Sequence, residues 1–262
     1  MKIAICTKKR PDRQKTLQIL YKLFSKEDIY LFVEPSEVKD YQKYEKVATI
    51  AVLGENDKGI RYARSFVLDY FKSHFPSEIL CMTDDDIDNF SIRTEKVKYW
   101  KMRKATLEEI KFMFVFNQAF LLRNPEYGQS TISFGGSNFL FDGEQKENTR
   151  CWAFMFFNIA NLNKYDINYD IANGYELFED YDITIEMLQK GLKNISFYKW
   201  AFNTKFANEG GVQQFRFDRV KNDKSVSYMC EKWPDVVGYF FSNNHKLPEI
   251  KVNWKKAYNG IQ

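Results

Sequence analysis

The sequence predicts an α/β fold with a mixed, mainly parallel sheet and helices on both of its faces. Two observations predict it. Across residues 1–90, short apolar segments alternate with amphipathic segments at the spacing of β-α-β units. Polar side chains follow directly after several of the apolar segments, and ligands bind beyond the carboxyl ends of the strands in such sheets. We therefore expect a ligand site at this edge of the sheet.

The elements of the first half follow from apolar periodicity. A continuous apolar run of about 4–8 residues favours a buried strand, and apolar residues three or four apart favour a helix. Leu17, Leu20 and Phe24 show the helical spacing. The predicted elements are a strand at Lys2–Cys6, a helix at Asp12–Ser25, strands at Ile29–Val33 and Ala48–Leu53, a helix at Ile60–His74, and a strand from Ile79 that ends in Asp84–Asp86.

The second half has a more mixed pattern. Thr106 and Glu109 have the spacing of a capping box, which predicts a helix that begins there and runs to about Leu122. No element is predicted beyond Asn208, where polar and aromatic segments alternate without a period. The other predicted elements are strands at Thr131–Phe134 and Asn138–Phe141, an apolar run at 151–160, and a helix at Tyr181–Lys190 that stops at Gly191.

Composition limits the class of protein. Hydrophobic residues make up 44% of the 262 positions and aromatic residues 17%, enough for a large buried core. The formal net charge is only +4, which argues against a general polyanion binder. Four cysteines without a C-x-x-C spacing indicate a reduced, cytoplasmic protein without structural zinc. With no signal peptide and no apolar run near eighteen residues, no membrane association is expected.

Asp84, Asp85 and Asp86 form the most informative motif, because a buried strand delivers three carboxylates to one edge of the sheet. Like charges side by side require a cation among them, and a divalent cation bound together with a ligand's phosphates is the usual solution. A solvated acidic turn is the alternative. Further polar candidates at or beyond strand ends are Thr7, Arg10, Glu34 and Asn56.

Two other motifs suit transfer chemistry. Arg61 and Arg64 lie three apart on the helix at 60–74, off its apolar stripe, and suit a diphosphate, while Gly59 lets the backbone approach a ligand. The alternative is a pair of exposed arginines. Asp180, at the start of a later helix, suits a general base for an incoming hydroxyl, or alternatively a helix cap.

A basic and aromatic segment between Arg93 and Lys104 suits nucleic acid, because basic side chains neutralise phosphates and aromatic rings stack on bases. The alternative is a solvated face. The candidate contacts in this segment are Lys98, Trp100, Lys101 and Arg103. His245 is a separate candidate, either as a late metal ligand or as a surface loop residue.

The order Gly59-Ile60-Arg61-Tyr62-Ala63-Arg64, a strand ending in Asp84–Asp86, and then Glu179-Asp180 resembles the GT-A glycosyltransferases of the family-2 type over roughly residues 1–190. The resemblance implies a Rossmann-like GT-A fold in one domain over residues 1–262. Residues 1–90 would form its nucleotide-sugar-binding half, and residues 91–262 a smaller acceptor-binding half with a C-terminal extension.

The same resemblance assigns roles. Thr7 and Glu34 would contact the uridine of UDP, although the family usually has Asp at the position of Glu34. Asp180 would be the base of an inverting transfer, with Asp182 as a competitor. Donor binding would use Thr7, Arg10, Glu34, Gly59, Arg61, Arg64, Asp84 and Asp85. Mn²⁺ or Mg²⁺ would be held by Asp86, Asp84 and His245.

A narrower resemblance comes from Lys2–Pro11, Phe32–Pro35 and Met82–Asp86. These segments are similar to phage enzymes that glycosylate hypermodified pyrimidines of DNA, in particular those of T-even-type phages that add a second glucose to glucosylated 5-hydroxymethylcytosine. This similarity implies UDP-glucose as donor, duplex DNA with modified cytosine as acceptor and the host cytoplasm as the workplace, and no obligatory protein partner is expected. With a charge of only +4, duplex binding would depend on a concentrated basic face and would weaken with salt.

Three other functions stay open at this point. A GT-A transferase could act on a surface glycan or a protein, and it would not bind DNA. A nucleic-acid-binding module without catalysis would carry the aspartates as structural residues. A nuclease built on Asp84–Asp86 is less favoured, because Arg61, Arg64 and the Glu179-Asp180 pair would then have no role.

Overall fold

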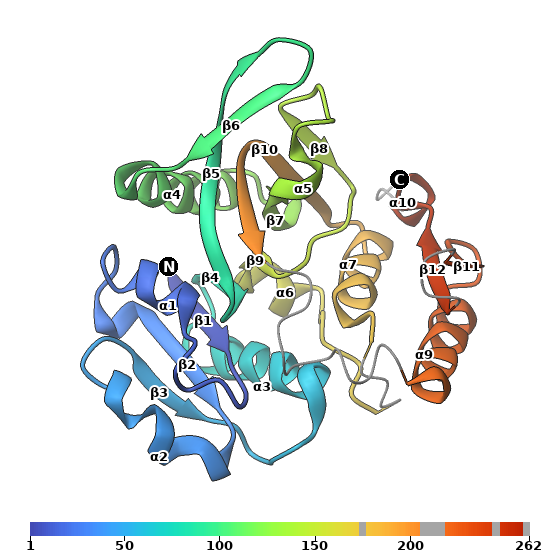
Figure 1. Ribbon diagram of the computed structural model, residues 1–262. Helices are drawn as coiled ribbons and strands as arrows, with labels where there is room; N and C mark the ends of the chain where they lie inside the picture. The colour runs from blue at the N-terminus through green and yellow to red at the C-terminus, as the bar shows by residue number, and fades with distance from the viewer. Residues whose placement is uncertain (173–176, 205–217, 243–246, 259–262) are drawn as a thin grey trace.

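The computed structural model describes residues 1–172, 177–204, 218–242 and 247–258. Within these residues a 10-stranded mixed sheet runs through the molecule in the order β3-β2-β1-β4-β9-β7-β10-β5-β6, with β8 paired to β10 (Figure 1). The mixed α/β architecture with helices on both faces of the sheet confirms the predicted fold class.

The first half of the chain builds a parallel core. Its strands are β1 (Lys2–Cys6), β2 (Ile29–Val33), β3 (Thr49–Val52) and β4 (Ile79–Asp84), all parallel. Cys6 pairs in register with both Phe32 and Asp84, so the carboxyl ends of three neighbouring strands are level. The edge at which the sequence predicts a ligand site is therefore formed by aligned strand ends.

The rest of the sheet is mostly antiparallel, and only β10 and β7 run parallel there. All five residues of β9 are buried, although its neighbours β4 and β7 are antiparallel to it. A continuous apolar run indicates that a strand is covered on both faces. It does not indicate whether the strand runs parallel or antiparallel to its neighbours. The strands are β5 (Ile87–Lys96), β6 (Trp100–Lys104), β7 (Tyr127–Phe134), β8 (Gln145–Glu147), β9 (Phe154–Asn158) and β10 (Lys193–Thr204).

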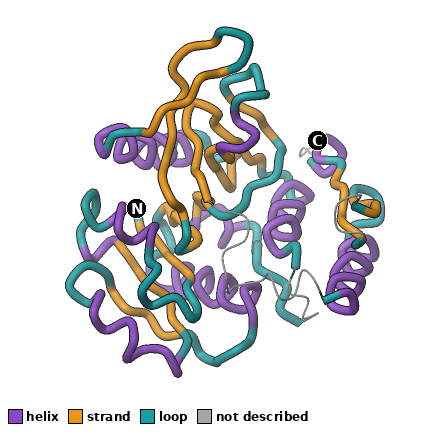
Figure 2. Tube along the Cα trace, in the orientation of Figure 1, coloured by secondary structure: helices purple, strands orange, loops and turns teal. Residues whose placement is uncertain are grey.

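Helices cover the sheet from two sides (Figure 2). Successive side chains of β1 point to opposite faces, so Ile3 and Ile5 join one buried cluster while Ala4 and Cys6 join the other. The first cluster includes residues of α1 (Lys15–Leu20) and α4 (Leu107–Arg123). The second includes residues of α3 (Gly59–His74), α6 (Ile159–Lys164) and α7 (Glu179–Gln189).

Two local predictions are wrong. The helix predicted at 12–25 is shorter in the structure and covers only α1. Thr16, in its first turn, is bound to the loop of aspartates after β4: its backbone N–H donates to Asp85 O and its hydroxyl to Asp84 O. The predicted strand at 138–141 is absent, and Gly135–Asn138 instead forms the short helix α5. Asn138 is held there by the guanidinium of Arg93, which donates to its side-chain and backbone oxygens. The capping box of Thr106 and Glu109 is confirmed.

The C-terminal region packs on the outer side of α7. It contains α9 (Arg219–Lys232), β11 (Val237–Phe241), β12 (Pro248–Val252) and α10 (Trp254–Ala257). Ile185 and Leu188 of α7 form a third buried cluster with Val226, Met229 and Ile250. A short helix, α2 (Val38–Tyr41), links β2 to β3. In the described part of the chain, none of the helices has the length and apolarity needed to cross a membrane.

Candidate active site

The three aspartates at the end of β4 divide into one buried carboxylate and two partly exposed ones. Asp85 accepts hydrogen bonds from Thr7 Oγ1 at 2.6 Å and Arg10 Nη1 at 2.7 Å, and its side chain is only 4% exposed. The side chains of Asp84 and Asp86 are 35% and 19% exposed. Alternate residues therefore present their carboxylates at the edge, in the Asp-x-Asp pattern that suits a nucleotide site.

Asp84 is a partly buried carboxylate whose ionised form is disfavoured by its surroundings. Burial raises its pKa to about 6, and neighbouring Asp86 and Asp85 raise it as well, while the guanidinium of Arg64 acts in the opposite direction. A bound cation would relieve this cost, so Asp84 and Asp86 fit a divalent ion. In the described ranges no three His, Cys, Asp or Glu side chains gather closely enough to hold a metal by themselves. Phosphate oxygens of a ligand would complete such a site, as is usual for Mg²⁺.

Arg64 joins two motifs that lie far apart in the sequence. Its Nη2 donates to Asp84 Oδ1 at 2.8 Å and its Nη1 to Glu179 Oε1 at 2.7 Å. Burial and neighbouring Asp180 raise the pKa of Glu179. Because Arg64 is on α3 and Glu179 begins α7, this bridge brings the Glu179-Asp180 pair to the Asp84–Asp86 edge.

The start of α7 is held under backbone strain. Phe178, the residue before Glu179, has a φ of 67°, in the left-handed region that non-glycine residues rarely adopt. Strained residues of this kind cluster at functional sites, where the surrounding structure compensates for them. Gly59, at the start of α3, has a φ of 84°, which explains a glycine there more directly than close approach to a ligand.

Asp180 is held by a residue that the motifs did not indicate. Its Oδ2 accepts from Arg150 Nη2 at 2.9 Å and Arg150 Nε at 3.1 Å. The guanidinium of Arg150 also lies over the rings of Tyr181, at 4.2 Å, and Trp152, at 5.0 Å. A lone arginine before an apolar strand carries no sequence signal, so only the fold reveals this contact.

The two arginines of α3 are both buried, although the sequence placed them off the apolar stripe. Arg61 pairs with Asp182 at 2.6 Å, as Arg64 pairs with Glu179. Asp182 also accepts from Trp233 Nε1 at 2.8 Å and pairs with Lys232 Nζ at 3.0 Å. Asp182 is therefore saturated with donors inside the protein, unlike Asp180.

The candidates for uridine lie at the ends of β1 and β2. Glu34 is buried, pairs with Lys8 Nζ at 2.8 Å and accepts from the backbone N–H of Asp57 at 2.9 Å. The hydroxyl of Thr7 accepts from Gln14 Nε2 at 2.7 Å, in addition to its bond to Asp85. Asn56 accepts from the N–H and hydroxyl of Ser36. These side chains lie where the sequence predicts the contacts with uridine.

The nucleic-acid candidates lie on the β5–β6 hairpin, which projects from the body of the molecule at the top of Figure 1. The ring of Trp100 lies under the guanidinium of Arg93 at 4.8 Å. Lys101 pairs with Glu95 at 2.7 Å and Arg103 with the capping-box Glu109 at 2.5 Å. Lys98 is in the turn that joins the two strands. His245, the candidate late metal ligand, lies outside the described residues.

Three comparisons with known proteins bear on this site. The model of the TET-Associated Glycosyltransferase family matches residues 1–211. No curated protein matches the sequence. Among solved structures, S. aureus TarS 1-349 in complex with UDP has a TM-score of 0.52 and 13% identity over 88% of this chain. GalNAc-T7 with UDP, GalNAc and Mn2+ has a TM-score of 0.53 and 9% identity over 87% of this chain.

At such low identity the two structures establish the fold alone, which is that of the GT-A glycosyltransferases. This chain spans 66% of the TarS chain and 50% of the GalNAc-T7 chain.

Proposed function

The chain belongs to the TET-associated glycosyltransferase family, and from this premise we propose that it transfers glucose from UDP-glucose to glucosylated 5-hydroxymethylcytosine in duplex DNA. The GT-A fold and the UDP bound in both similar structures support a UDP-sugar donor. The association of the family with TET supports a modified DNA base as acceptor. The similarity to phage enzymes that glycosylate DNA pyrimidines supports the finer assignment of glucose and the glucosylated base.

The bridge from Asp84 through Arg64 to Glu179 carries the proposal, because it unites a donor edge with a candidate base. A DNA-binding module would have no use for two carboxylate motifs joined by a buried arginine. A transferase needs both on one edge, since the donor's diphosphate and the acceptor's hydroxyl flank the same sugar carbon.

The donor would lie along the carboxyl edge of the parallel strands. Glu34 and Thr7 would contact uridine at the ends of β1 and β2, and Arg10 would balance charge near the diphosphate. Asp84 and Asp86 would hold Mn²⁺ or Mg²⁺, which when bound offsets the negative charge on the departing UDP.

Asp180 would act as the general base. In the described residues, Arg150 engages only Oδ2 of this carboxylate, and no side chain donates to Oδ1. Oδ1 would accept the proton of the acceptor hydroxyl while that oxygen bonds to the anomeric carbon. The bond from this carbon to the UDP oxygen breaks at the same time, with its electron pair remaining on the phosphate. An in-line attack of this kind inverts the anomeric centre.

The test is UDP release by the purified protein with Mn²⁺ and UDP-glucose on three duplexes: unmodified, 5-hydroxymethylated and glucosyl-5-hydroxymethylated. Turnover on the third alone supports the proposal, and turnover on the second makes the protein a first-sugar enzyme. Silence on all three, with UDP still bound, would reject DNA and favour a glycan or protein acceptor. NMR of the product's anomeric proton tests inversion.

A further inference from the structure

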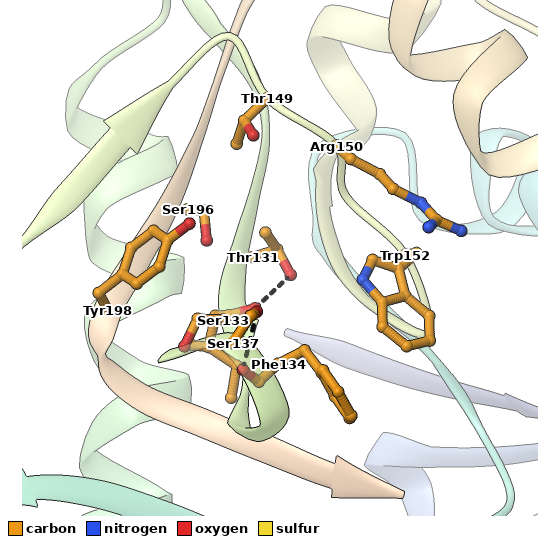
Figure 3. A pocket seen from close by; sticks show the side chains of 10 residues that line it. Thr131, Ser133, Phe134, Ser137, Thr149, Arg150, Trp152, Ser196 and Tyr198 are labelled. Atoms are coloured by element: carbon orange, nitrogen blue, oxygen red, sulfur yellow. Dashed lines mark hydrogen bonds between the residues drawn. The ribbon is translucent and has the colours of Figure 1, made fainter. Parts of the chain in front are cut away.

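A polar cavity of about 150 Å³ lies between β7, β10 and the segment that precedes β9 (Figure 3). Figure 3 shows Thr149, Ser196 and Tyr198 on one side of it and Arg150 and Trp152 on the other. We propose that this cavity is the acceptor subsite and that it holds the pyranose ring already attached to the acceptor base. This inference rests on the proposed function, since it names the part of the acceptor that the same site recognises.

The cavity adjoins both halves of the candidate active site. Arg150 lines it and also binds Asp180 through two nitrogens. Trp152 lines it too, and the next residue, Ala153, accepts a hydrogen bond from the backbone N–H of Asp84 at 2.9 Å. A ring in this cavity would therefore lie beside the candidate base, next to the edge that carries the candidate metal ligands Asp84 and Asp86.

Two hydroxyls in the cavity have no protein partner. Ser196 and Thr149 are 4% and 8% exposed as whole residues, and neither side-chain oxygen has a hydrogen-bond partner among the described residues. Neither oxygen is closed off from the cavity, since neither belongs to the fully buried polar atoms without a partner. Water would pair with such hydroxyls, and a ligand with its own hydroxyls would replace that water.

The lining matches a sugar better than a base. Ser and Thr hydroxyls both donate and accept, as sugar hydroxyls do. The described residues that line the cavity include none of the Asn, Gln, Asp or Glu side chains that read base edges in pairs of hydrogen bonds. Among the described lining residues Arg150 is the only charged one, and it already pairs with Asp180, which fits a neutral ligand. The indole of Trp152 and the phenol ring of Tyr198 supply apolar surface on opposite sides (Figure 3).

The size is right for one ring. A cavity needs about 10–15 Å³ to hold one water molecule. This cavity, at about 150 Å³, is roughly ten times larger. It is below the about 300–1,000 Å³ that is usual for drug-sized ligands. A single pyranose fits within this volume.

The test is binding of methyl β-D-glucopyranoside, measured by saturation-transfer NMR with the full chain. We expect saturable binding to the unaltered protein and about 3- to 10-fold weaker binding to each of Ser196→Ala and Thr149→Val, because each loses one hydrogen bond. Their affinity for UDP, measured by calorimetry, stays unchanged and reports that they fold. Tyr198→Phe, at a less buried position, provides a third variant if either of the first two unfolds.

Three results would overturn the inference: no saturable glucoside binding, equal binding by all variants, or binding of 5-hydroxymethylcytidine in place of the glucoside. The DNA assay with UDP-glucose, run on the same preparation, separates this inference from the proposed function. Glucoside binding without transfer to any duplex keeps the sugar subsite and rejects DNA as the acceptor. Transfer to glucosylated DNA without glucoside binding keeps the function and rejects the subsite.

Discussion

Arg61 and Asp182 form a buried ion pair, with 2.6 Å between Arg61 Nη1 and Asp182 Oδ2 and side chains only 4% and 2% exposed. Tyr228 and Trp233 also donate to Asp182, and Lys232 pairs with it. This carboxylate therefore joins α3, α7 and α9. Asp180, two residues earlier in the same helix, has one arginine as its side-chain partner in the described part of the chain. Neighbouring carboxylates thus have different partners, which favours a structural role for Asp182 and a chemical one for Asp180.

The first prediction concerns stability. Asp182→Asn removes the carboxylate charge that pairs with the buried Arg61 at 2.6 Å, so the free energy of unfolding should fall by about 3–5 kcal/mol. Urea unfolding followed by tryptophan fluorescence measures the change. Glu186→Gln, on the same helix, removes a partly exposed pair with Lys190 and should cost less than about 1 kcal/mol. An unchanged midpoint in Asp182→Asn would contradict the structural role.

The second prediction concerns catalysis. Asp180→Asn removes the candidate base while keeping its shape, so kcat should fall by about 10²- to 10⁴-fold while the affinity for UDP-glucose stays within a factor of about three. Initial rates of UDP release and calorimetric titration of the donor give the two values. A large loss of donor affinity with little change in kcat would instead assign Asp180 to donor binding. Glu186→Gln again serves as the control on the same helix.

The sequence predicts those features of the structure that depend on residues close together in the chain. The strands Lys2–Cys6 and Ile29–Val33 were predicted at their observed bounds. A short apolar run between two polar turns predicts a buried strand, and both runs lie in the parallel part of the sheet. The capping box of Thr106 and Glu109 was equally clear, since both partners lie within one helical turn. Asp84–Asp86 could be placed at the ligand edge for the same reason.

What could not be predicted depends on partners far apart in the chain. Arg150 reaches Asp180 only because the segment before β9 runs beside the start of α7. The sequence predicts a basic and aromatic segment at Arg93–Lys104 but not that Lys101 and Arg103 pair with Glu95 and Glu109, because these two acids are indistinguishable in sequence from other surface acids. The cavity at Ser196 and the region after Arg219 had no recognised motif at all.

The third prediction is a pH dependence. The pKa of Asp84 is about 6 in the folded protein against an ordinary value of 3.8, so the folded state holds this proton more tightly than the unfolded state. Stability is therefore lost as pH rises from about 4 to 6, and the cost of the ionised carboxylate is fully present above pH 6. Asp84→Asn, which cannot ionise, should raise the melting temperature at pH 7.5 and leave it unchanged at pH 3.5.

Circular dichroism melts of both proteins at the two pH values make this measurement, without added metal or nucleotide. Asp88→Asn removes the more exposed pair with Lys15 and should give no gain at pH 7.5. If Asp84→Asn instead melts lower than the unaltered protein at pH 7.5, the attraction of Arg64 outweighs the burial of Asp84, and the pKa of this carboxyl would lie below its ordinary value.

The last prediction concerns DNA binding by the β5–β6 hairpin. Replacing Lys98, Lys101 and Arg103 together by Gln should weaken duplex binding and reduce the slope of log K against log salt by about 0.9 for each phosphate that the hairpin no longer neutralises. Lys98, in the turn of the hairpin, should account for more of this effect than Arg103, whose guanidinium already pairs with Glu109.

Fluorescence anisotropy of a labelled duplex at several salt concentrations gives both the affinity and the salt slope. Lys39→Gln, at an exposed position of α2 in the first half of the chain, is the matched control. An equal salt slope in the triple variant and the control would show that the hairpin is a solvated surface, and that the duplex binds elsewhere.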